Sequence, residues 1–372
     1  MEKKNTWETY SSKQLKELEK INAQYRDFLD NGKTERECID TIVNTIEKSG
    51  YRELESLIKE GAALKTGDKV YSVWMNKSIA MFQIGRKPMT DGMNILGAHI
   101  DSPRLDVKQN PLYEDGGFAY LDTHYYGGVK KYQWVTIPLA IHGVIVKKDG
   151  TCVEINIGEN EDDPVFFVSD LLIHLAQEQL EKKAAKVIEG EALDITVGNK
   201  PLLIDKKDKK KDEKEAGKEA VKAGVLDILK ETYDIHEEDF VSAELEIVPA
   251  GKAREAGFDR SMTLAYGQDD RVCAYTSMQA MLDSNVTDRT MCCILVDKEE
   301  IGSVGATGMQ SHFFENAVAE VMNLAGEYSE LNVRRCLAHS CMLSSDVSSA
   351  FDPTYASSFD KKNVAYLGGG MV

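Results

Sequence analysis

The spacing of apolar residues in the first hundred positions predicts two helices followed by three strands. Residues 7–30 and 34–48 both carry apolar side chains at the spacing of an amphipathic helix. Short runs rich in β-branched and apolar residues come next, which is typical of strands. These runs are 70–74, 78–84 and 93–98. The pattern predicts an α/β arrangement whose third strand leads directly into His99.

The pattern changes between about residues 105 and 252. Strand-like segments alternate with turns at 134–137, 140–146 and 152–157, and a helix is predicted over 169–183. Residues 205–222 are nearly all Lys, Asp, Glu, Ala and Gly, which is typical of a solvated, mobile loop. We therefore expect an inserted β-rich domain over 105–252. It would separate two parts of a surrounding domain, 1–104 and 253–372.

Strand-like segments that end in acidic residues return after residue 253. Residues 262–266 precede Asp269 and Asp270, and a helical stripe begins at Val272. The apolar run 292–296 precedes Glu299 and Glu300. A further apolar segment, 336–343, is predicted as a strand and precedes Asp346. Because open α/β sheets bind ligands at the carboxyl ends of their strands, we expect these acids to gather at one edge.

Each of these motifs has an ordinary structural explanation when it stands alone. Aspartate is a preferred residue at a helix N-terminus, and an acidic tetrad is usually a solvated turn. Four strand ends, however, offer carboxylates together with an imidazole. They are His99 with Asp101, Asp269 with Asp270, Glu299 with Glu300, and Asp346. Such a set is expected to hold paired Zn²⁺, Mn²⁺ or Co²⁺ ions, with one carboxylate left to act as a base.

Composition narrows the classes of protein that remain. The 372 residues carry a net charge of -17, which disfavours nucleic acids and anionic membranes as partners. In residues 205–222 the interleaved acids and missing aromatics likewise disfavour a nucleic-acid patch. The seven cysteines are odd in number and lack framework spacing, as expected of reduced thiols in the cytoplasm. No secretory signal or membrane-length apolar segment is predicted.

The order of the motifs resembles that of the aspartyl aminopeptidase and vacuolar aminopeptidase I family of co-catalytic zinc exopeptidases. The resemblance rests on residues 97–103, the Asp269-Asp270-Arg271 turn, residues 299–303 and the Ser345-Asp346 turn. It implies a phosphorylase/hydrolase-like three-layer α/β catalytic domain, split by an inserted β-rich dimerisation domain. It also implies peptide substrates, two Zn²⁺ ions per subunit and dimers that assemble into a homo-oligomeric dodecamer.

The same resemblance implies a role for each site residue. His99 and Asp346 would be terminal ligands of one zinc, and the Asp269 carboxylate would bridge the two ions. The peptide bond between Asp269 and Asp270 would be cis. Glu300 would ligate the other zinc and Glu299 would be the general base. Asp101 would orient His99, and His174 would bind substrate in a neighbouring subunit's site.

One departure from the family pattern leaves alternatives open. The family's second zinc takes a further histidine from a segment beyond the Asp346 motif, whereas this chain ends at Val372. We therefore expect a C-terminally shortened version of a longer protein. The alternatives are a related metal-dependent deacylase and a catalytically impaired assembly subunit. A serine or cysteine hydrolase is disfavoured, because Ser102 and Ser303 lie in no nucleophile-elbow pattern. The preferred N-terminal residue of the substrate stays open.

Overall fold

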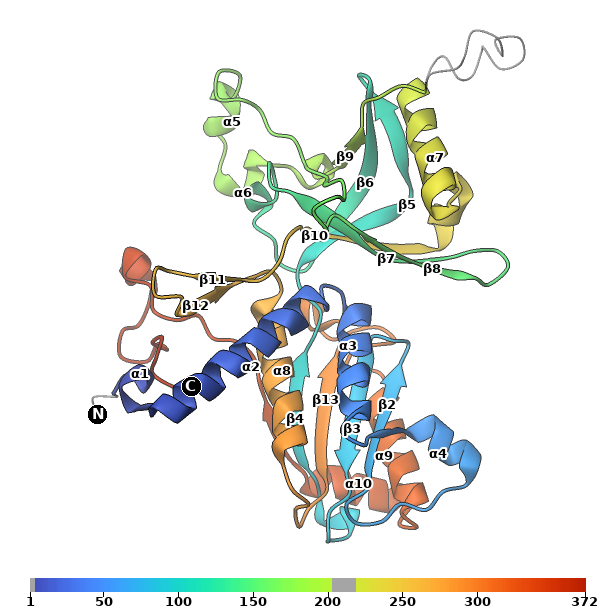
Figure 1. The fold of residues 1–372 in the computed structure, drawn as a ribbon, viewed down its shortest axis with the longest axis vertical. Helices are drawn as coiled ribbons and strands as arrows, with labels where there is room; N and C mark the ends of the chain where they lie inside the picture. The colour runs from blue at the N-terminus through green and yellow to red at the C-terminus, as the bar shows by residue number, and fades with distance from the viewer. Residues whose placement is uncertain (1–3, 203–218) are drawn as a thin grey trace. The chain divides into compact units, whose positions relative to one another are not determined.

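The computed structural model describes residues 4–202 and 219–372, which fall into two compact units (Figure 1). Unit 1 comprises Met1–Asp101 and Ala253–Val372, and unit 2 comprises Ser102–Lys252. The chain thus leaves unit 1 after Asp101 and re-enters it at Ala253. The sequence predicts domain boundaries near residues 105 and 252. The assignment of these two units as separate domains stays a prediction.

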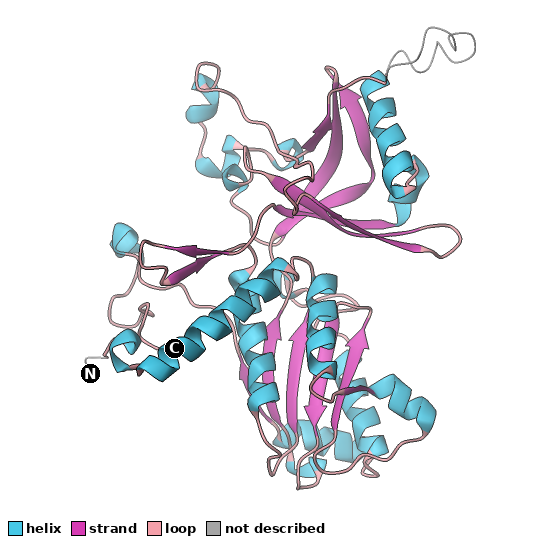
Figure 2. Ribbon diagram, viewed as in Figure 1, coloured by secondary structure: helices cyan, strands magenta, loops and turns pink. Residues whose placement is uncertain are grey.

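Unit 1 contains a six-stranded mixed sheet in the order β1-β2-β3-β13-β4-β14 (Figure 2). The strands are β1 (Arg52–Glu53), β2 (Lys69–Trp74), β3 (Ser78–Gln83), β13 (Met291–Val296), β4 (Asn94–His99) and β14 (Cys341–Ser344). β3 runs antiparallel to both β2 and β13, whereas β4 runs parallel to both β13 and β14. The carboxyl ends of β13, β4 and β14 therefore meet at one edge of the sheet.

Helices cover both faces of this sheet because its central strands are apolar on both sides. Along β13, Cys293 and Leu295 pack into one buried cluster, and Cys292 and Ile294 pack into another. The first cluster includes residues of α2 (Ser12–Asp30), α3 (Glu35–Glu47) and α8 (Gln268–Asp283). The second includes residues of α4 (Leu54–Glu60), α9 (Phe313–Leu324) and α10 (Glu330–His339). Burial on both faces explains why these strands appear as continuous apolar runs in the sequence.

The remaining elements of unit 1 are short. They are α1 (Thr6–Thr9), the hairpin of β11 (Arg254–Ala256) and β12 (Met262–Leu264), and the 3₁₀ turns Met89–Asp91, Glu299–Ile301 and Pro353–Ser358. β12 pairs only with β11, so it lies outside the six-stranded sheet. Asp269 lies at the start of α8, in the strand-to-helix turn that the sequence predicts, although the strand before it belongs to the hairpin and not to the main sheet.

Unit 2 is built on a second six-stranded sheet, in which every pairing is antiparallel, in the order β8-β7-β10-β5-β6-β9. The strands are β5 (Arg104–Asp115), β6 (Phe118–Tyr126), β7 (Leu139–Val146), β8 (Cys152–Ile157), β9 (Ile195–Gly198) and β10 (Ala243–Pro249). The helices are α5 (Gln177–Leu180), α6 (Ala184–Val187) and α7 (Ala220–Tyr233), with 3₁₀ turns at Lys131–Gln133, Gly190–Ala192 and Glu237–Ser242.

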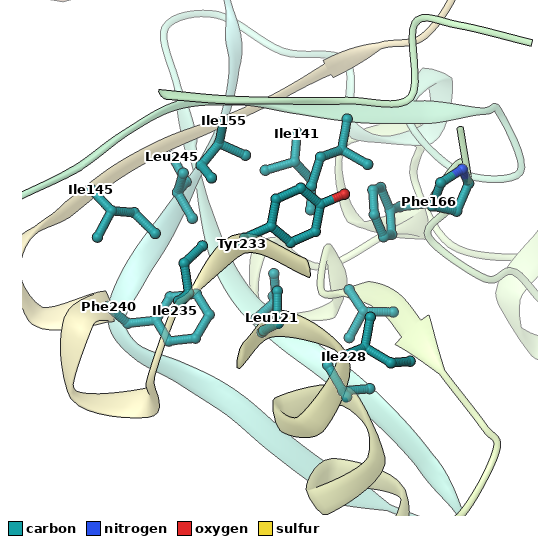
Figure 3. Close-up of a pocket in the computed structure, with 15 residues that line it drawn as sticks. Leu121, Ile141, Ile145, Ile155, Phe166, Ile228, Tyr233, Ile235, Phe240 and Leu245 are labelled. Carbon is teal, nitrogen blue, oxygen red and sulfur yellow. The ribbon is translucent and has the colours of Figure 1, made fainter. Parts of the chain in front are cut away.

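An apolar cavity of about 220 Å³ lies within unit 2, between strand residues such as Ile141 and Leu245 and α7 residues such as Ile228 (Figure 3). Tyr233 contributes the only polar side chain among its lining residues. A cavity with this lining cannot stabilise a charged transition state.

Most predicted strands and the helix at 34–48 are confirmed, but other elements differ from the prediction. The helix predicted over 7–30 is interrupted at Tyr10, because Ser11 and Gln14 form a capping box that starts α2. The segment 134–137 is not a strand: Thr136 has a φ of 61°, and Val135 makes only an isolated bridge to Val168.

The helix predicted over 169–183 and the strand predicted over 336–343 are also wrong in part. Only Gln177–Leu180 is helical in the first, because its apolar residues Leu171 to Leu175 are exposed and have no core to pack against. In the second, residues up to His339 belong to α10, because Val333 and Cys336 are buried one turn apart. The loop predicted over 205–222 is wrong at its end, because the chain is helical from Ala220. Residues 205–218 of this predicted loop lie outside the described part of the chain.

Two glycines allow a matched test of how closely the start of β4 and the end of α10 approach. Gly92 and Gly50 have φ values of 90° and 88°, so alanine is strained at either site, and Gly92, with a ψ of 163°, lies in a region that essentially only glycine adopts. At Gly92 a Cβ would also overlap the carbonyl group of His339, whereas at Gly50 it would meet no atom. We expect Gly92→Ala to destabilise the protein by about 1–3 kcal/mol more than Gly50→Ala in chemical denaturation. Equal losses would contradict this packing.

Candidate metal centre and active site

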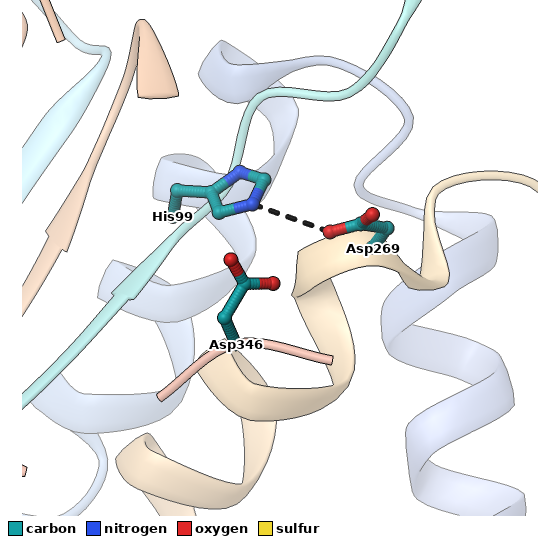
Figure 4. A group of neighbouring side chains, drawn as sticks. All are labelled: His99, Asp269 and Asp346. Carbon is teal, nitrogen blue, oxygen red and sulfur yellow. Dashed lines mark ion pairs between the residues drawn. The ribbon is translucent and has the colours of Figure 1, made fainter. Parts of the chain in front are cut away.

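Three side chains from separate elements converge at the carboxyl edge of the sheet in unit 1 (Figure 4). His99 ends β4, Asp269 lies at the start of α8, and Asp346 follows β14. One potential ligand atom from each lies within 4.8 Å of the others. His99 Nε2 is 3.3 Å from Asp269 Oδ1 and 3.7 Å from Glu299 Oε2. A buried imidazole and exposed carboxylates therefore face one small volume.

The carboxylate of Asp101 orients His99. His99 Nδ1 lies 3.0 Å from the Asp101 carbonyl oxygen and 3.2 Å from Asp101 Oδ1. Both oxygens can only accept, so Nδ1 carries a proton, and in the neutral form of the ring Nε2 keeps the lone pair that faces Asp269. Asp101 is fully buried, which makes this orientation rigid. A carboxylate behind a histidine is the usual arrangement for an imidazole that ligates a metal.

Asp101 also holds the turn that carries the paired glutamates. The backbone N–H groups of Glu299 and Glu300 donate to its Oδ1 and Oδ2, each at 3.2 Å. Asp101 thus fixes His99 and the glutamate turn with a single carboxylate. On the other side of the site, Arg271 is buried and donates to the Ile100 carbonyl at 3.2 Å, which ties α8 to the same segment.

The glutamate turn has a second anchor below it, in Asp297. This fully buried carboxylate accepts the backbone N–H of Lys298 at 2.7 Å and the Thr307 hydroxyl at 2.5 Å. Ser78 bridges the same region, because its hydroxyl donates to the Thr307 carbonyl and accepts the Asp297 N–H. Between these anchors the chain takes positive φ values at Lys298, Gly302 and Ser303. The result is a tight loop that projects Glu299 and Glu300 from the sheet.

The peptide bond between Asp269 and Asp270 is cis, as the family resemblance implies. Asp269 is about half exposed and faces His99, whereas Asp270 is fully buried. Among the described residues, the weakly donating Cys273 thiol is the partner of the Asp270 carboxylate, and neither oxygen meets a stronger N–H or O–H donor. Buried carboxylate oxygens without a strong hydrogen-bond donor are expected where a cation supplies the missing charge.

The titration behaviour of the site reflects burial together with an excess of negative charge. Burial lowers the pKa of His99, but the hydrogen bond to Asp101 and the nearby carboxylates raise it to about 9 overall. Burial raises the pKa of Asp270 to about 6. Burial and the Asp269 carboxylate raise the pKa of Glu300 to about 7. A divalent cation would favour the deprotonated form of every one of these groups, so the donor set fits a metal.

The structure brings together most of the predicted site residues. His99, Asp269 and Asp346 form the potential metal-binding group, with Glu299 beside it and Asp101 behind it. Glu300 lies outside that three-residue group, although the charges of Asp269 and His99 influence its pKa. His174 is exposed in a turn of unit 2.

Sequence reasoning missed the residues that support the loop. No sequence motif assigns a role to Asp297 or Thr307. The position of Asp297 immediately after a fully apolar strand was a usable signal, because a charged residue there must be paired or capped if the strand end is buried.

The sheet and the carboxylate–imidazole cluster at its carboxyl edge define an α/β metalloenzyme. Residues 28–372 match the family described as aminopeptidase I zinc metalloprotease (M18). A protein of Clostridium acetobutylicum named "Probable M18 family aminopeptidase 1" is 60% identical over 371 residues, which are 100% of this chain and 78% of that protein. A Thermotoga maritima protein of the same name is 42% identical, with the same coverage.

Solved structures agree with these sequence relatives. The M18 aminopeptidase of Thermotoga maritima superposes with a TM-score of 0.91 at 42% identity, and aminopeptidase I of Clostridium acetobutylicum with 0.88 at 57%. Both comparisons cover 100% of this chain and 78% of the other. The S. cerevisiae mApe1 dodecamer, at 19% identity and a TM-score of 0.72, shares the fold; 94% of this chain and 76% of that one are covered.

The chain belongs to the M18 family of aminopeptidase I zinc metalloproteases. It is therefore a zinc-dependent aminopeptidase, a hydrolase of peptide bonds, with a mixed α/β fold. Within the described residues, no helix combines the length and the apolar character needed to cross a membrane.

The Thr307 hydroxyl can be tested as a support of the glutamate loop. Thr307→Val keeps the shape of the side chain but removes the donor to Asp297, whereas Thr307→Ser keeps the hydroxyl. We expect the valine variant to lose about 10- to 100-fold in kcat, because small misplacements of catalytic groups are costly. The serine variant should retain most of the activity, and zinc content should be equal in both. Full kcat in the valine variant would contradict the role of this contact.

Proposed function

We propose that the chain removes N-terminal residues from peptides at a two-zinc site with Glu299 as the general base. The observation that carries this proposal is the convergence of His99, Asp269 and Asp346, with Glu299 Oε2 only 3.7 Å from His99 Nε2. His99 and Asp346 would hold one zinc, Glu300 the other, and Asp269 would bridge them. Zinc is the proposed metal, with Mn²⁺ or Co²⁺ as substitutes that the same donors accept.

Zinc at this position would act as a Lewis acid that polarises the scissile carbonyl and stabilises its developing negative charge. The remaining steps are performed by side chains of this chain. Glu299 is about half exposed, so a carboxylate oxygen of its side chain can take a proton from the attacking water. The same oxygen then delivers the proton to the nitrogen of the leaving amine. Asp101 keeps the His99 ring and the Glu299 backbone in place throughout.

Glu299 differs from its neighbours in ways that suit it to this role. The Asp101 carboxylate accepts the backbone N–H of Glu299 and so fixes the main chain of the proposed base. The side-chain carboxylate of Glu299 extends into solvent. Glu300, the adjacent acid, is more enclosed, and burial together with the Asp269 carboxylate raises its pKa to about 7, so a nearby cation would favour its ionised form. One acid therefore suits proton transfer and the other suits a metal.

The two-unit organisation supports a wider proposal about assembly. Unit 1 would be the phosphorylase/hydrolase-like three-layer catalytic domain, and unit 2 the inserted β-rich dimerisation domain. His174 would reach the substrate of a neighbouring subunit, and the run Leu171–Leu175 around it offers an exposed apolar surface. We propose a cytoplasmic homo-oligomer built from dimers, with the dodecamer of S. cerevisiae mApe1 as its pattern.

Two alternative functions can each be tested separately. A related deacylase would cleave acylated substrates that lack a free α-amine, which an aminopeptidase rejects. A catalytically impaired assembly subunit would bind fewer than two metals per chain and would not turn over any aminoacyl anilide. Metal content per chain, measured together with hydrolysis of free and N-acetylated anilides, separates these possibilities.

The Glu299→Gln variant tests the general base. The substitution keeps the size of the side chain but removes its ability to accept a proton, so kcat should fall by about 10²- to 10⁴-fold. Zinc content, measured by mass spectrometry, should be unchanged because Glu299 is not a proposed ligand. Glu315→Gln on α9, with similar exposure, is the matched control and should leave kcat unchanged. Wild-type activity in Glu299→Gln would overturn the assignment.

A further inference from the structure

The turn between β2 and β3 contacts the loop that follows the paired glutamates. Trp74 ends β2 and Ser78 begins β3, and the two residues pair across the hairpin. The Trp74 indole N–H donates to the Ala306 carbonyl at 2.9 Å, and the Ser78 hydroxyl donates to the Thr307 carbonyl at 2.6 Å. The two ends of one hairpin turn therefore hold two successive carbonyl groups of the loop.

This loop, residues 302–312, is closed at its base beside the glutamate turn. The Gln310 side-chain amide donates to the Gly302 carbonyl at 3.0 Å, and the Gln310 backbone N–H donates to the Ser303 carbonyl at 3.2 Å. The Ser303 N–H in turn donates to the Lys298 carbonyl at 2.6 Å. Because the ends of the loop are joined to each other and to the glutamate turn, a shift of its middle residues would displace that turn as well.

The indole ring of Trp74 makes a second contact at the far end of the same loop. It stacks on Phe313, the first residue of α9, with ring centroids 6.2 Å apart and an interplanar angle of 17°. Phe313 belongs to a buried cluster under the sheet and so gives the indole a fixed platform. Trp74 itself remains 42% exposed, so a smaller aromatic ring at this position leaves no core cavity.

On its other side the hairpin turn is anchored to α3 (Figure 1). Three side-chain contacts join them: Arg36 Nη1 to the Met75 carbonyl at 3.0 Å, Asn76 Nδ2 to Asp40 Oδ1 at 3.1 Å, and Lys77 Nζ to Glu35 Oε2 at 3.7 Å. The turn also takes positive φ values of 52° at Met75 and 53° at Asn76. Such a backbone is unfavourable for residues other than glycine and persists only where surrounding contacts fix it. The turn is therefore a firm support for the Trp74 side chain.

We propose that Trp74 is a positioning residue for the general base. Its indole N–H fixes the 302–312 loop and, through that loop, the place from which the Glu299 carboxylate takes a proton. The inference rests on the proposed function, in which Glu299 is the base. It adds to that function a residue that lies outside the potential metal-binding group.

The Trp74→Phe variant tests this role, because it keeps an aromatic ring over Phe313 but removes the N–H donor. The assay uses the zinc-loaded protein and the aminoacyl anilide that the wild type cleaves fastest. We expect kcat to fall about 3- to 10-fold with KM within about twofold of wild type, because a small displacement of a catalytic group slows the reaction without removing substrate contacts. Trp7→Phe on α1, where Trp7 is 46% exposed, is the matched control and should change neither value. A wild-type kcat in Trp74→Phe, or a loss confined to KM, would overturn the inference and leave the aminopeptidase function intact.

The Glu299→Gln background shows whether Trp74 acts through the base. With no base to position, Trp74→Phe should lower kcat by less than about twofold in this background. An equal loss in both backgrounds would mean that Trp74 supports the fold or the metals instead, and would overturn the inference. Wild-type activity in Glu299→Gln alone, or no hydrolysis of any anilide by the wild type, would overturn the proposed function and the inference with it.

Hydrogen–deuterium exchange of the full chain gives a readout that does not depend on turnover. The backbone amides of residues 298–312 should exchange at least about threefold faster in Trp74→Phe than in the wild type or in Trp7→Phe, because one hydrogen bond that holds the loop is lost. The amides of β13 should exchange at the wild-type rate, which shows that the sheet is intact. Unchanged exchange over residues 298–312 would contradict the contact on which the inference depends.

Discussion

The carboxylate of Asp101 is the constraint on which the rest of the site depends. It is fully buried at the end of β4, where an unpaired charge would be costly, and it is satisfied by three donors. One of these is the imidazole of His99, and the other two are the backbone N–H groups of Glu299 and Glu300. A single buried charge therefore sets the His99 tautomer and the position of the glutamate turn relative to it.

This arrangement is available only because β4 and β13 are parallel neighbours. Val296 pairs with His99, so both strands end at the same level of the sheet, and Asp297 and Asp101 follow them on adjacent loops. Asp297 then supports the glutamate turn from beneath through Lys298 and Thr307. Two buried carboxylates hold the loop from opposite sides. This loop carries Glu299 and Glu300, the residues proposed as general base and metal ligand.

The sequence was sufficient for the parts of the molecule that depend on local pattern. The strand at 292–296 is apolar at every position, and the residues His99, Asp269 and Asp346 follow or precede regular elements at recognisable motifs. The resemblance added their order, and with it the cis bond before Asp270. The site could be predicted because its residues stand next to strong signals.

The parts that the sequence could not supply depend on tertiary contacts. The segment from Leu171 to Leu175 has helical spacing but no core to pack against, so it does not form the predicted helix. The apolar run 336–343 predicts a strand at Cys336, but Cys336 and Val333 are buried residues of α10. The Thr307 hydroxyl lies ten residues from Asp297, and the fit of Met342 over Gly97 joins two strands that are distant in sequence. The spacing of apolar residues along the sequence carries no information about such contacts.

The central claim is that these carboxylates and His99 form a two-metal centre. Anomalous X-ray diffraction from crystals of the zinc-loaded protein, collected above and below the zinc absorption edge, tests it most directly. The account predicts two peaks about 3.5–4 Å apart, with Asp269 between them and His99 and Asp346 on one of them. A single peak would contradict the paired centre, and no peak beside His99 would contradict the metal site itself.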